Sequence, residues 1–500
     1  PVPPQDVVTD APIVLENTGH ANVAGTIAMA RQSDPNTATS GFFFNVRDNP
    51  GLDYRIDGSG NPQGYAVFGR VVNGLNVLEV MFSQARTNAG GAFTNLPVTD
   101  HFTEESESLT EADLIYLHDA NVVDRARFRT DAGSAVAGAV NPADVLIISS
   151  LGADGSSQVF LPLTGAVWQY NNLSVATGAP AVTGNLVVFY DPATGLKNAV
   201  GPSAAGVILF TQSAEQAWSF RNLTAETGGL AIDGKLTVFT STDGRVHAAG
   251  VTDAGHVVLY RQTGTGSAWE FRDITTQDLD ARAVATPTFV GDLTSYVTSW
   301  NGLNIVGLDA DGEIQVVWWS PGIDQNLWTT SNLSEITGAP RLTGGLTVYL
   351  TSWQATNIVG ITQDGHVSVT WWLPSFGGNW NKDDLTLQTG GPNLVASSIT
   401  SYVTGWGATN VAGLDADGKL WVYWWTPDFG TGGWQFNDLI AALPAGTKPM
   451  VGQITGVTST GPTINLVGSA ANGDVMRFSW NATDGLGWLD EDVSYLASLA

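Results

Sequence analysis

The chain has 500 residues, of which 43% are hydrophobic and 13% charged, with 58 glycines and no cysteine. This length fits two or three folded units, the composition is typical of a globular β-rich protein, and the lack of cysteine excludes disulfides, thiolate metal sites and a cysteine nucleophile. The 47 acidic and 20 basic residues give a formal charge of −27, which disfavours nucleic acid as a partner because its phosphates would be repelled.

The hydropathy, the start of the chain and its charge bear on location. No run of about 18 apolar residues occurs, so no membrane-spanning helix is predicted. The chain begins at Pro1 without Met or a charged-then-apolar leader, and we expect that an upstream segment has been removed. The acidity and the lack of cysteine favour an exported protein, either extracellular, on the cell surface or periplasmic.

The first part of the chain is predicted to form short strands and turns. The expected strands cover residues 26–29, 42–45 and 65–72, which are runs of apolar and aromatic residues. Asn73-Gly74 marks a turn, and the apolar spacing of residues 75–82 predicts a short helix. We assign residues 1–83 to a first domain.

Several motifs follow one another in this domain. They are GTIAMAR at 25–31, DPNTATS at 34–40, Phe42-Phe43, Asp48-Asn49 with Leu52-Asp53, and GYAVFGRVV at 64–72. In this order they resemble the second half of a bacterial cyclophilin-type peptidyl-prolyl isomerase, over residues 13–82. The sequence differs from that family at Gly41, where glutamine is usual, and at Gly51, where a bulkier residue is usual.

The resemblance implies a partial cyclophilin-like β-barrel that holds a proline-containing peptide or protein, without a metal or cofactor. Such enzymes lower the rotation barrier of roughly 18–20 kcal/mol about the bond before proline. By resemblance, the prolyl pocket would be formed by the side chains of Met29, Phe43, Leu52 and Tyr65 and by the backbone of Ala30 and Arg31. An alternative for Phe42, Phe43 and Phe44 is ordinary strand core. The family's catalytic arginine is expected upstream of Pro1, so isomerase activity is expected only if that half is supplied.

Residues 84–134 are predicted to be an acidic connector. Five acids lie between residues 104 and 113. Ser108 and Glu111 could form a capping box that opens a helix, whereas residues 114–117 would suit a strand equally well. We interpret the acids as a solvated face rather than a metal site.

The rest of the chain, residues 135–500, is repetitive. Trp300, Trp353 and Trp406 recur at a step of 53 residues, and so do Asn304, Asn357 and Asn410. A tryptophan followed four residues later by Asn or Asp and then an aliphatic residue occurs seven times, beginning at Trp168, Trp218, Trp269, Trp328, Trp380, Trp434 and Trp488. The sequence therefore contains seven units of roughly 50 to 59 residues.

Each unit reads as four antiparallel strands with an Asp-Gly or similar turn in the middle. Seven such units predict a mainly β fold, a seven-bladed β-propeller, and they resemble tryptophan-rich bacterial propeller repeats, including lectin-like ones. The tandem Trp371-Trp372 would then pack against two different neighbouring blades, because adjacent strand residues point to opposite faces. In the first unit only the weak stretch 135–140 is available as the first strand.

Three sets of residues in the repeats are candidate sites. The first set, Asp309 to Gly312 and Asp415 to Gly418, resembles fragments of calcium loops, but a hairpin turn explains it better because further acids are missing. The second set consists of tryptophans and asparagines that could form sugar pockets or could be inter-blade packing: Trp300, Asn304, Trp353, Asn357, Trp406 and Asn410. The third set, Asn172, Asn222 and Asn332, matches glycosylation acceptors, yet Asp replaces Asn in the other four units, which favours a turn-forming role.

We therefore expect an exported cyclophilin-like protein with a β-propeller that binds protein or glycan. One alternative is a competent isomerase whose missing half comes from an upstream part of the gene product. The other is a structural subunit of a cell-surface layer or filament, self-assembled through the propeller and the open barrel edge.

Overall fold

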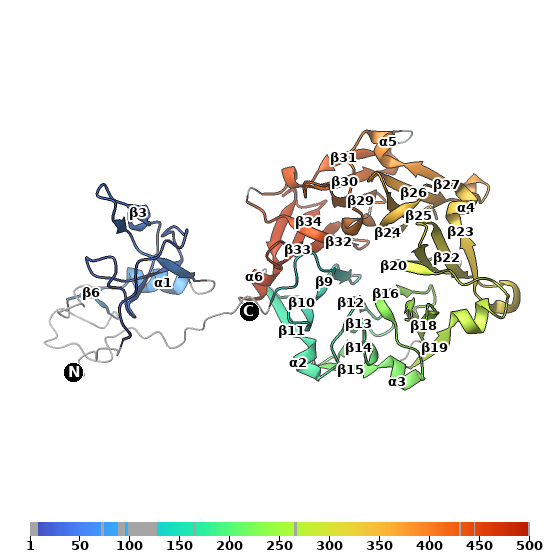
Figure 1. The fold of residues 1–500 in the computed structure, drawn as a ribbon, viewed down its shortest axis with the longest axis horizontal. Coiled ribbons are helices and arrows are strands. Elements are labelled where there is room, and N and C mark those ends of the chain that lie inside the picture. The colour runs from blue at the N-terminus through green and yellow to red at the C-terminus, as the bar shows by residue number, and fades with distance from the viewer. Residues whose placement is uncertain are drawn as a thin grey trace. The chain divides into compact units, whose positions relative to one another are not determined.

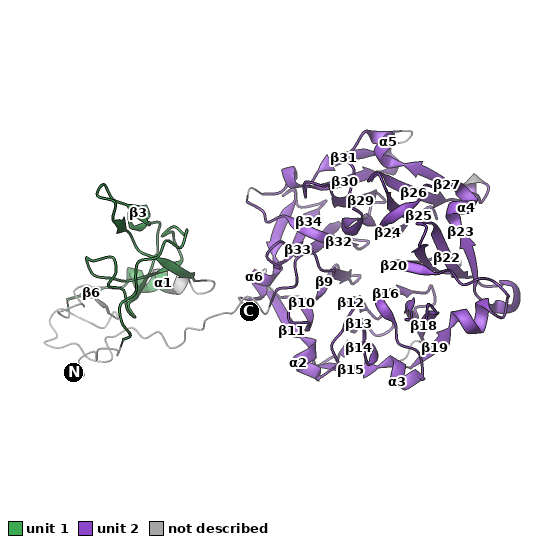
Figure 2. Ribbon diagram, viewed as in Figure 1, with its two compact units in different colours: residues 1–123, 499 green, residues 124–498, 500 purple. Residues whose placement is uncertain are grey.

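The computed structural model describes residues 9–71, 75–88, 96–98, 128–163, 167–264, 268–429, 432–444 and 446–498. The chain divides into two compact units, residues 1–123 and 124–498 (Figure 2). Both are built mainly from antiparallel strands, as predicted. Among the described residues, no helix is long and apolar enough to cross a membrane. The acids of the predicted connector lie outside the described residues.

The first unit contains a three-stranded antiparallel sheet in the order β2–β1–β5. The elements of this unit are β1 (Thr26–Met29), β2 (Phe42–Phe44), β3 (Arg55–Ile56), β4 (Pro62–Gln63), β5 (Val67–Arg70), α1 (Leu75–Ser83), β6 (Arg86–Thr87) and β7 (Leu96–Pro97). The three predicted strands and the predicted helix are thus confirmed, each within a few residues. In the described part of this unit, β2 and β5 each pair on one side only.

Seven four-stranded sheets form the second unit, and the chain runs round them as the blades of a ring (Figure 1). Blades 1 to 3 consist of β8 (Val136–Val140), β9 (Leu146–Leu151), β10 (Ser157–Leu163) and β11 (Val167–Asn172); β12 (Val187–Tyr190), β13 (Lys197–Ser203), β14 (Gly206–Gln212) and β15 (Trp218–Asn222); and β16 (Asp233–Thr240), β17 (Val246–Val251), β18 (Val257–Gln262) and β19 (Trp269–Asp273). Blades 4 and 5 consist of β20 (Phe289–Val297), β21 (Leu303–Asp309), β22 (Ile314–Trp319) and β23 (Thr329–Asn332); and β24 (Leu342–Leu350), β25 (Thr356–Thr362), β26 (Val367–Trp372) and β27 (Trp380–Asp384). Blades 6 and 7 consist of β28 (Thr400–Val403), β29 (Thr409–Leu414), β30 (Leu420–Trp425) and β31 (Gln435–Asp438); and β32 (Met450–Thr458), β33 (Thr463–Ala470), β34 (Val475–Asn481) and β35 (Leu489–Asp492). The seven predicted repeats are seven blades, and the weak first strand of the first repeat is β8.

The Asn or Asp that ends the fourth strand, followed by an aliphatic residue and Ser or Thr, opens a one-turn α-helix in blades 1, 2, 4, 5 and 7. Five such helices are α2 (Leu173–Thr177), α3 (Leu223–Thr227), α4 (Leu333–Thr337), α5 (Leu385–Thr389) and α6 (Val493–Ala497). In α3, the Asn222 side chain accepts the Ala225 N–H, Leu223 is buried, and Thr224 Oγ1 accepts the Val207 N–H at 3.0 Å. The motif therefore caps the helix, anchors it in the core and ties it to the third strand. The predicted turn-forming role of these residues is confirmed.

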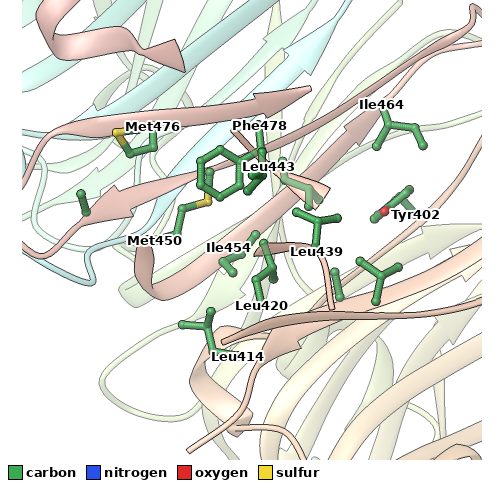
Figure 3. Close-up of a cluster of buried hydrophobic side chains, with 14 residues drawn as sticks. Tyr402, Leu414, Leu420, Leu439, Leu443, Met450, Ile454, Ile464, Met476 and Phe478 are labelled. Atoms are coloured by element: carbon green, nitrogen blue, oxygen red, sulfur yellow. The ribbon is translucent and has the colours of Figure 1, made fainter. Parts of the chain in front are cut away.

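From blade 1 to blade 7, each interface between consecutive blades is filled by apolar side chains from both of them. Figure 3 shows the interface of blades 6 and 7, where Leu414, Leu420 and Leu439 pack against Met450 and Phe478. A fully buried Leu, Met or Phe contributes about 1.5–3 kcal/mol relative to an exposed one. Because both faces of blades 2 to 6 are covered in this way, the hydrophobic core of the propeller lies in the interfaces between blades.

The ring closes through a short segment that precedes β8. The Thr130 N–H donates to the carbonyl of Gly473, the turn glycine of blade 7, at 2.9 Å. The same bond joins Leu342 to Gly312 and Leu394 to Gly365 at other blade junctions, each at 2.9 Å. Contacts to the propeller thus begin before the predicted boundary at residue 135, and the last junction repeats an ordinary one.

A buried carboxylate reinforces this closing junction. Asp474, whose side chain is 0% exposed, accepts from Arg129 Nε at 2.7 Å and from Lys448 Nζ at 2.7 Å. Arg129 precedes blade 1, whereas Asp474 belongs to blade 7, so the pair crosses the seam. Both cations are partly exposed, which reduces the strength of the attraction.

Asp474→Ala is expected to destabilise the propeller by about 2 kcal/mol, because it removes the only acceptor shared by two cations at the seam among the described residues. The measurement is urea unfolding followed by tryptophan fluorescence. All 18 tryptophans lie at or after residue 168, so the signal reports on the propeller alone. Asp417→Ala, at an exposed turn, serves as the control and should change the free energy of unfolding by less than about 0.5 kcal/mol. Equal effects of the two variants would contradict the role of the seam.

Blade 3 differs from the other blades by a buried histidine. His247 is 2% exposed and stacks on Phe239 at 4.9 Å between ring centroids, and its Nδ1 has no hydrogen-bond partner among the described residues. Burial lowers the pKa of His247 to about 4 from the ordinary 6.5. The folded state therefore favours the neutral imidazole, and the associated stability is complete above pH 6.5 and is lost as the pH falls towards 4.

His247→Asn places here the residue that blades 4, 5 and 6 have opposite their tyrosines. Between pH 6.5 and pH 4 the wild type should lose roughly 2–3 kcal/mol more stability than this variant, because each pKa unit corresponds to about 1.4 kcal/mol. Urea unfolding of the propeller at both pH values measures the difference. His20→Asn, in the first unit, should behave as the wild type, and a parallel loss in all three proteins would refute the assignment.

Candidate functional site

Three of the residues predicted for the prolyl pocket lie together in the first unit. The rings of Phe43 and Tyr65 meet edge to face, with centroids 5.5 Å apart. The Tyr65 N–H donates to the Leu52 carbonyl at 2.9 Å. The Asn22 side chain donates to the carbonyls of Leu52 and Tyr65 at 3.0 and 3.2 Å. The cluster therefore has a fixed backbone frame.

Arg31 and Ala30 use their polar groups within the unit. The Arg31 guanidinium lies over the Tyr65 ring, 4.5 Å from its centroid, and its Nε donates to the Gly64 carbonyl at 2.9 Å. The Ala30 N–H donates to the Gly41 carbonyl at 2.8 Å. Arg31 thus supports the aromatic wall, and the Ala30 N–H is already engaged.

Strand register separates Met29 from this cluster. Met29 lies opposite Phe42, and Ala28 lies opposite Phe43. Neighbouring strand residues point to opposite faces, so Met29 shares a face with Phe42 rather than with Phe43. Phe42 is 55% exposed. The departure at Gly51 leaves space, since a Cβ there would meet nothing within 4 Å.

In the propeller, each predicted tryptophan contacts a tryptophan of the next blade. The centroid distances are 5.5 Å for Trp300 and Trp372, 5.7 Å for Trp353 and Trp425, and 5.4 Å for Trp406 and Trp480, all with steeply inclined rings. Trp300 and Trp406 are 45% and 43% exposed, and Trp353 is half-buried. The same arrangement therefore occurs at three successive interfaces, between blades 4 and 7.

The tandem tryptophans divide between two interfaces, as predicted. Trp371 packs in the core between blades 5 and 6, whereas Trp372 meets Trp300 of blade 4. The indole N–H of Trp372 donates to the Gly378 carbonyl at 2.8 Å, which fixes the ring against the following loop. Trp425 makes the equivalent bond to Gly432 at 3.1 Å. The sequence predicts only a packing role for the tandem tryptophans, because sequence spacing does not show which residues meet across blades.

A pocket of about 230 Å³ lies at the first of these interfaces. Its lining includes Tyr296, Trp300, Asn304, Trp318, Trp372 and Trp380. No charged residue lines it. Aromatic faces with a few polar groups suit a neutral, ring-shaped ligand.

The asparagines are partly engaged by their own blades. Asn304 Nδ2 donates to the Gly302 carbonyl and Asn410 Nδ2 donates to the Ala408 carbonyl, both at 3.1 Å. Asn357 takes the same place opposite Tyr349. Asn198 and Asn465 occupy the equivalent strand position in blades 2 and 7. Because asparagine also recurs in blades that lack the exposed tryptophan, it indicates a role in strand geometry. The amide nitrogens of Asn304 and Asn410 are engaged, so mainly their amide oxygens are left for a ligand.

The two candidate calcium loops are hairpin turns. Asp309 Oδ1 accepts the N–H groups of Asp311 and Glu313 at 3.0 and 2.9 Å. Asp415 Oδ1 accepts those of Asp417 and Lys419, both at 2.9 Å. Over the described ranges, no group of three or more His, Asp or Glu side chains is placed to hold a metal ion.

Comparison with known proteins agrees with this division. Residues 4–99 match the family model of the cyclophilin type peptidyl-prolyl cis-trans isomerase, a longer stretch than residues 13–82. A peptidyl-prolyl cis-trans isomerase of Acinetobacter baylyi is 43% identical over 94 residues, which is 19% of this chain and 47% of the relative. Isomerase cyp18 of Streptomyces antibioticus is 38% identical over 106 residues, or 21% of this chain and 63% of the relative. The chain thus spans about half the length of the first of these curated relatives and under two thirds of the second.

The propeller resembles a solved structure in fold. The crystal structure of BP39L lectin from Burkholderia pseudomallei superposes with a TM-score of 0.51 at 12% identity, covering 72% of this chain and 98% of that one. Such a likeness at low identity shows the fold alone. The chain therefore joins a segment that matches the cyclophilin type isomerase family, at residues 4–99, to a seven-bladed β-propeller.

Proposed function

We propose that the propeller binds glycans at the tryptophan pairs of three interfaces, those of blades 4 and 5, 5 and 6, and 6 and 7. We further propose that the cyclophilin type segment contacts a proline-containing peptide or protein. The observation that carries the first part is the threefold recurrence of an inter-blade tryptophan pair, with an exposed ring in two of the three pairs. Ordinary packing would bury both rings, but Trp300 and Trp406 keep over two fifths of their surface exposed. The exported setting stays a prediction.

The chemistry of the pocket suits a sugar ring. An indole face stacks on the C–H groups of a pyranose, and the amide oxygen of an asparagine accepts from a hydroxyl. The volume of about 230 Å³ lies below the roughly 300–1,000 Å³ typical of drug-sized ligands, so we expect one sugar residue in each pocket. The related fold of BP39L belongs to a protein that is named a lectin, which is consistent with the proposal.

Replacing the exposed tryptophans is expected to remove the sites one at a time. A glycan array probed with the full chain selects the ligand, and titration calorimetry then measures its stoichiometry. Each of Trp300→Ala, Trp353→Ala and Trp406→Ala should lower the number of sites by one, because loss of stacking weakens a site roughly tenfold.

The control for these variants is Leu387→Ala, a change at a side chain that is 71% exposed on α5, outside the tryptophan pairs. It should leave the stoichiometry unchanged. Near-ultraviolet circular dichroism verifies that each variant keeps its fold. Undiminished glycan binding by the triple tryptophan variant would refute the proposal.

The prolyl site has its own test, based on the two faces of β2. Phe43→Ala should weaken binding of a fluorescein-labelled Ala-Pro peptide at least fivefold, since the Phe43 ring forms the wall with Tyr65. Phe42→Ala, on the opposite face, should leave the affinity unchanged. Fluorescence anisotropy gives both values, and equal effects would place the peptide elsewhere. In a protease-coupled assay we expect this polypeptide alone to bind without turnover, because the part that matches the isomerases spans only 47% of the Acinetobacter baylyi relative.

A further inference from the structure

The three tryptophan pairs, the first of which lines the pocket described above, have the same surroundings but differ at one position on the fourth strand of the blade. Ser331, Asp383 and Asn437 lie opposite Val316, Val369 and Val422 in the strand register, so they are equivalent. Each accepts the indole N–H of the first tandem tryptophan, at 3.0 Å from Trp318, 2.6 Å from Trp371 and 2.6 Å from Trp424. A hydroxyl, a carboxylate and an amide thus do the same structural task.

Because three different side chains accept the indole N–H, this position can vary without a change in the structure around the tryptophans. Holding the indole requires only a hydrogen-bond acceptor, which serine and asparagine provide in the flanking pockets. The negative charge of Asp383 is therefore not needed for the frame. A half-buried carboxylate without a compensating cation costs stability, which makes a ligand-related role for the charge the better explanation.

Asp383 has no cationic partner among the described residues. Its Oδ2 accepts from Trp371, and its Oδ1 accepts from Gln388 Nε2 at 2.9 Å. The adjacent Lys382 points away, and its ammonium donates to the Gly338 carbonyl at the end of the preceding blade. Burial, and less strongly the charge of Asp383, raises the pKa of Tyr349, which packs in the same interface as Trp371. The two side chains that donate to the carboxylate, those of Trp371 and Gln388, are both neutral.

We propose that the pocket between blades 5 and 6 selects a sugar with a protonated amine, a hexosamine, while the two flanking pockets take neutral sugars. This inference rests on the proposed glycan binding. The Asp383 carboxylate would pair with the ammonium, and the faces of Trp353 and Trp425 would add cation–π attraction. The acidic chain, with its charge of −27, also favours the approach of a cation.

The test compares amino and neutral sugars on the full chain. Glucosamine, galactosamine and mannosamine are titrated at pH 7 alongside their N-acetylated forms and the parent hexoses, and calorimetry gives the affinity and number of sites. The wild type should show one site that prefers the amine at least fivefold. Asp383→Asn should abolish this preference while keeping the affinity for neutral sugars. Asn437→Asp should create a second amine-selective site, and Ser331→Asp should do the same in the first pocket.

The outcomes distinguish the two levels of the proposal. Neutral sugars that bind with no amine preference, or an Asp383→Asn variant that keeps the preference, would overturn the hexosamine assignment alone. Sugars of both kinds that fail to bind any variant, all of which keep their fold by near-ultraviolet circular dichroism, would overturn glycan binding and this inference with it. A gain of amine binding in Asn437→Asp supports the assignment even if Asp383→Asn is unstable.

Discussion

The packing of each blade against two neighbours is the interaction on which the propeller depends. A four-stranded sheet has two faces, and each face here is covered by another blade of the same kind. The apolar side chains of a sheet pack in the interfaces with the blades on either side of it. The described residues of a single blade therefore do not form a separate core. Stability is therefore a property of the closed ring, and an unclosed junction would expose two apolar faces at once.

The ring closes through the same backbone hydrogen bond that joins blades at other junctions. The bond from Thr130 to Gly473 repeats the bonds from Leu342 to Gly312 and from Leu394 to Gly365. At the seam Asp474 joins Arg129 from before the first blade to Lys448 in the last, and the junction of blades 4 and 5 has an ion pair in the same place, between Arg341 and Glu313. The seam differs in that the Asp474 side chain is 0% exposed, whereas that of Glu313 is 29% exposed. Elsewhere the chain connects neighbouring blades covalently, whereas at the seam only non-covalent contacts do so.

The candidate pockets arise from the same packing. Where a blade presents Trp300 or Trp353 in the loop after its first strand, the next blade meets it with the second tryptophan of its tandem pair. Trp406 instead meets Trp480 of blade 7, a single tryptophan that follows Ser479. In each of blades 4 to 6, the fourth strand accepts a hydrogen bond from the indole N–H of the first tandem tryptophan of the same blade. The tryptophan pairs thus extend the apolar interface between two blades towards its exposed end. Such a design lets a polar position vary without loss of the frame, as at Ser331, Asp383 and Asn437.

The sequence by itself determined the number of blades, the four strands of each, the turn glycines and the two-sided packing of the tandem tryptophans, because these follow from local periodicity and an internal repeat. It also located the cyclophilin type segment through a run of motifs. Only the tertiary structure decided which tryptophan meets which across blades, since that depends on contacts between residues some 70 positions apart in the chain. Strand register likewise placed Met29 away from Phe43 although both belong to neighbouring strands. The physical reason is the same in each case: the direction of a side chain follows from its strand, but its neighbours follow from how whole sheets pack.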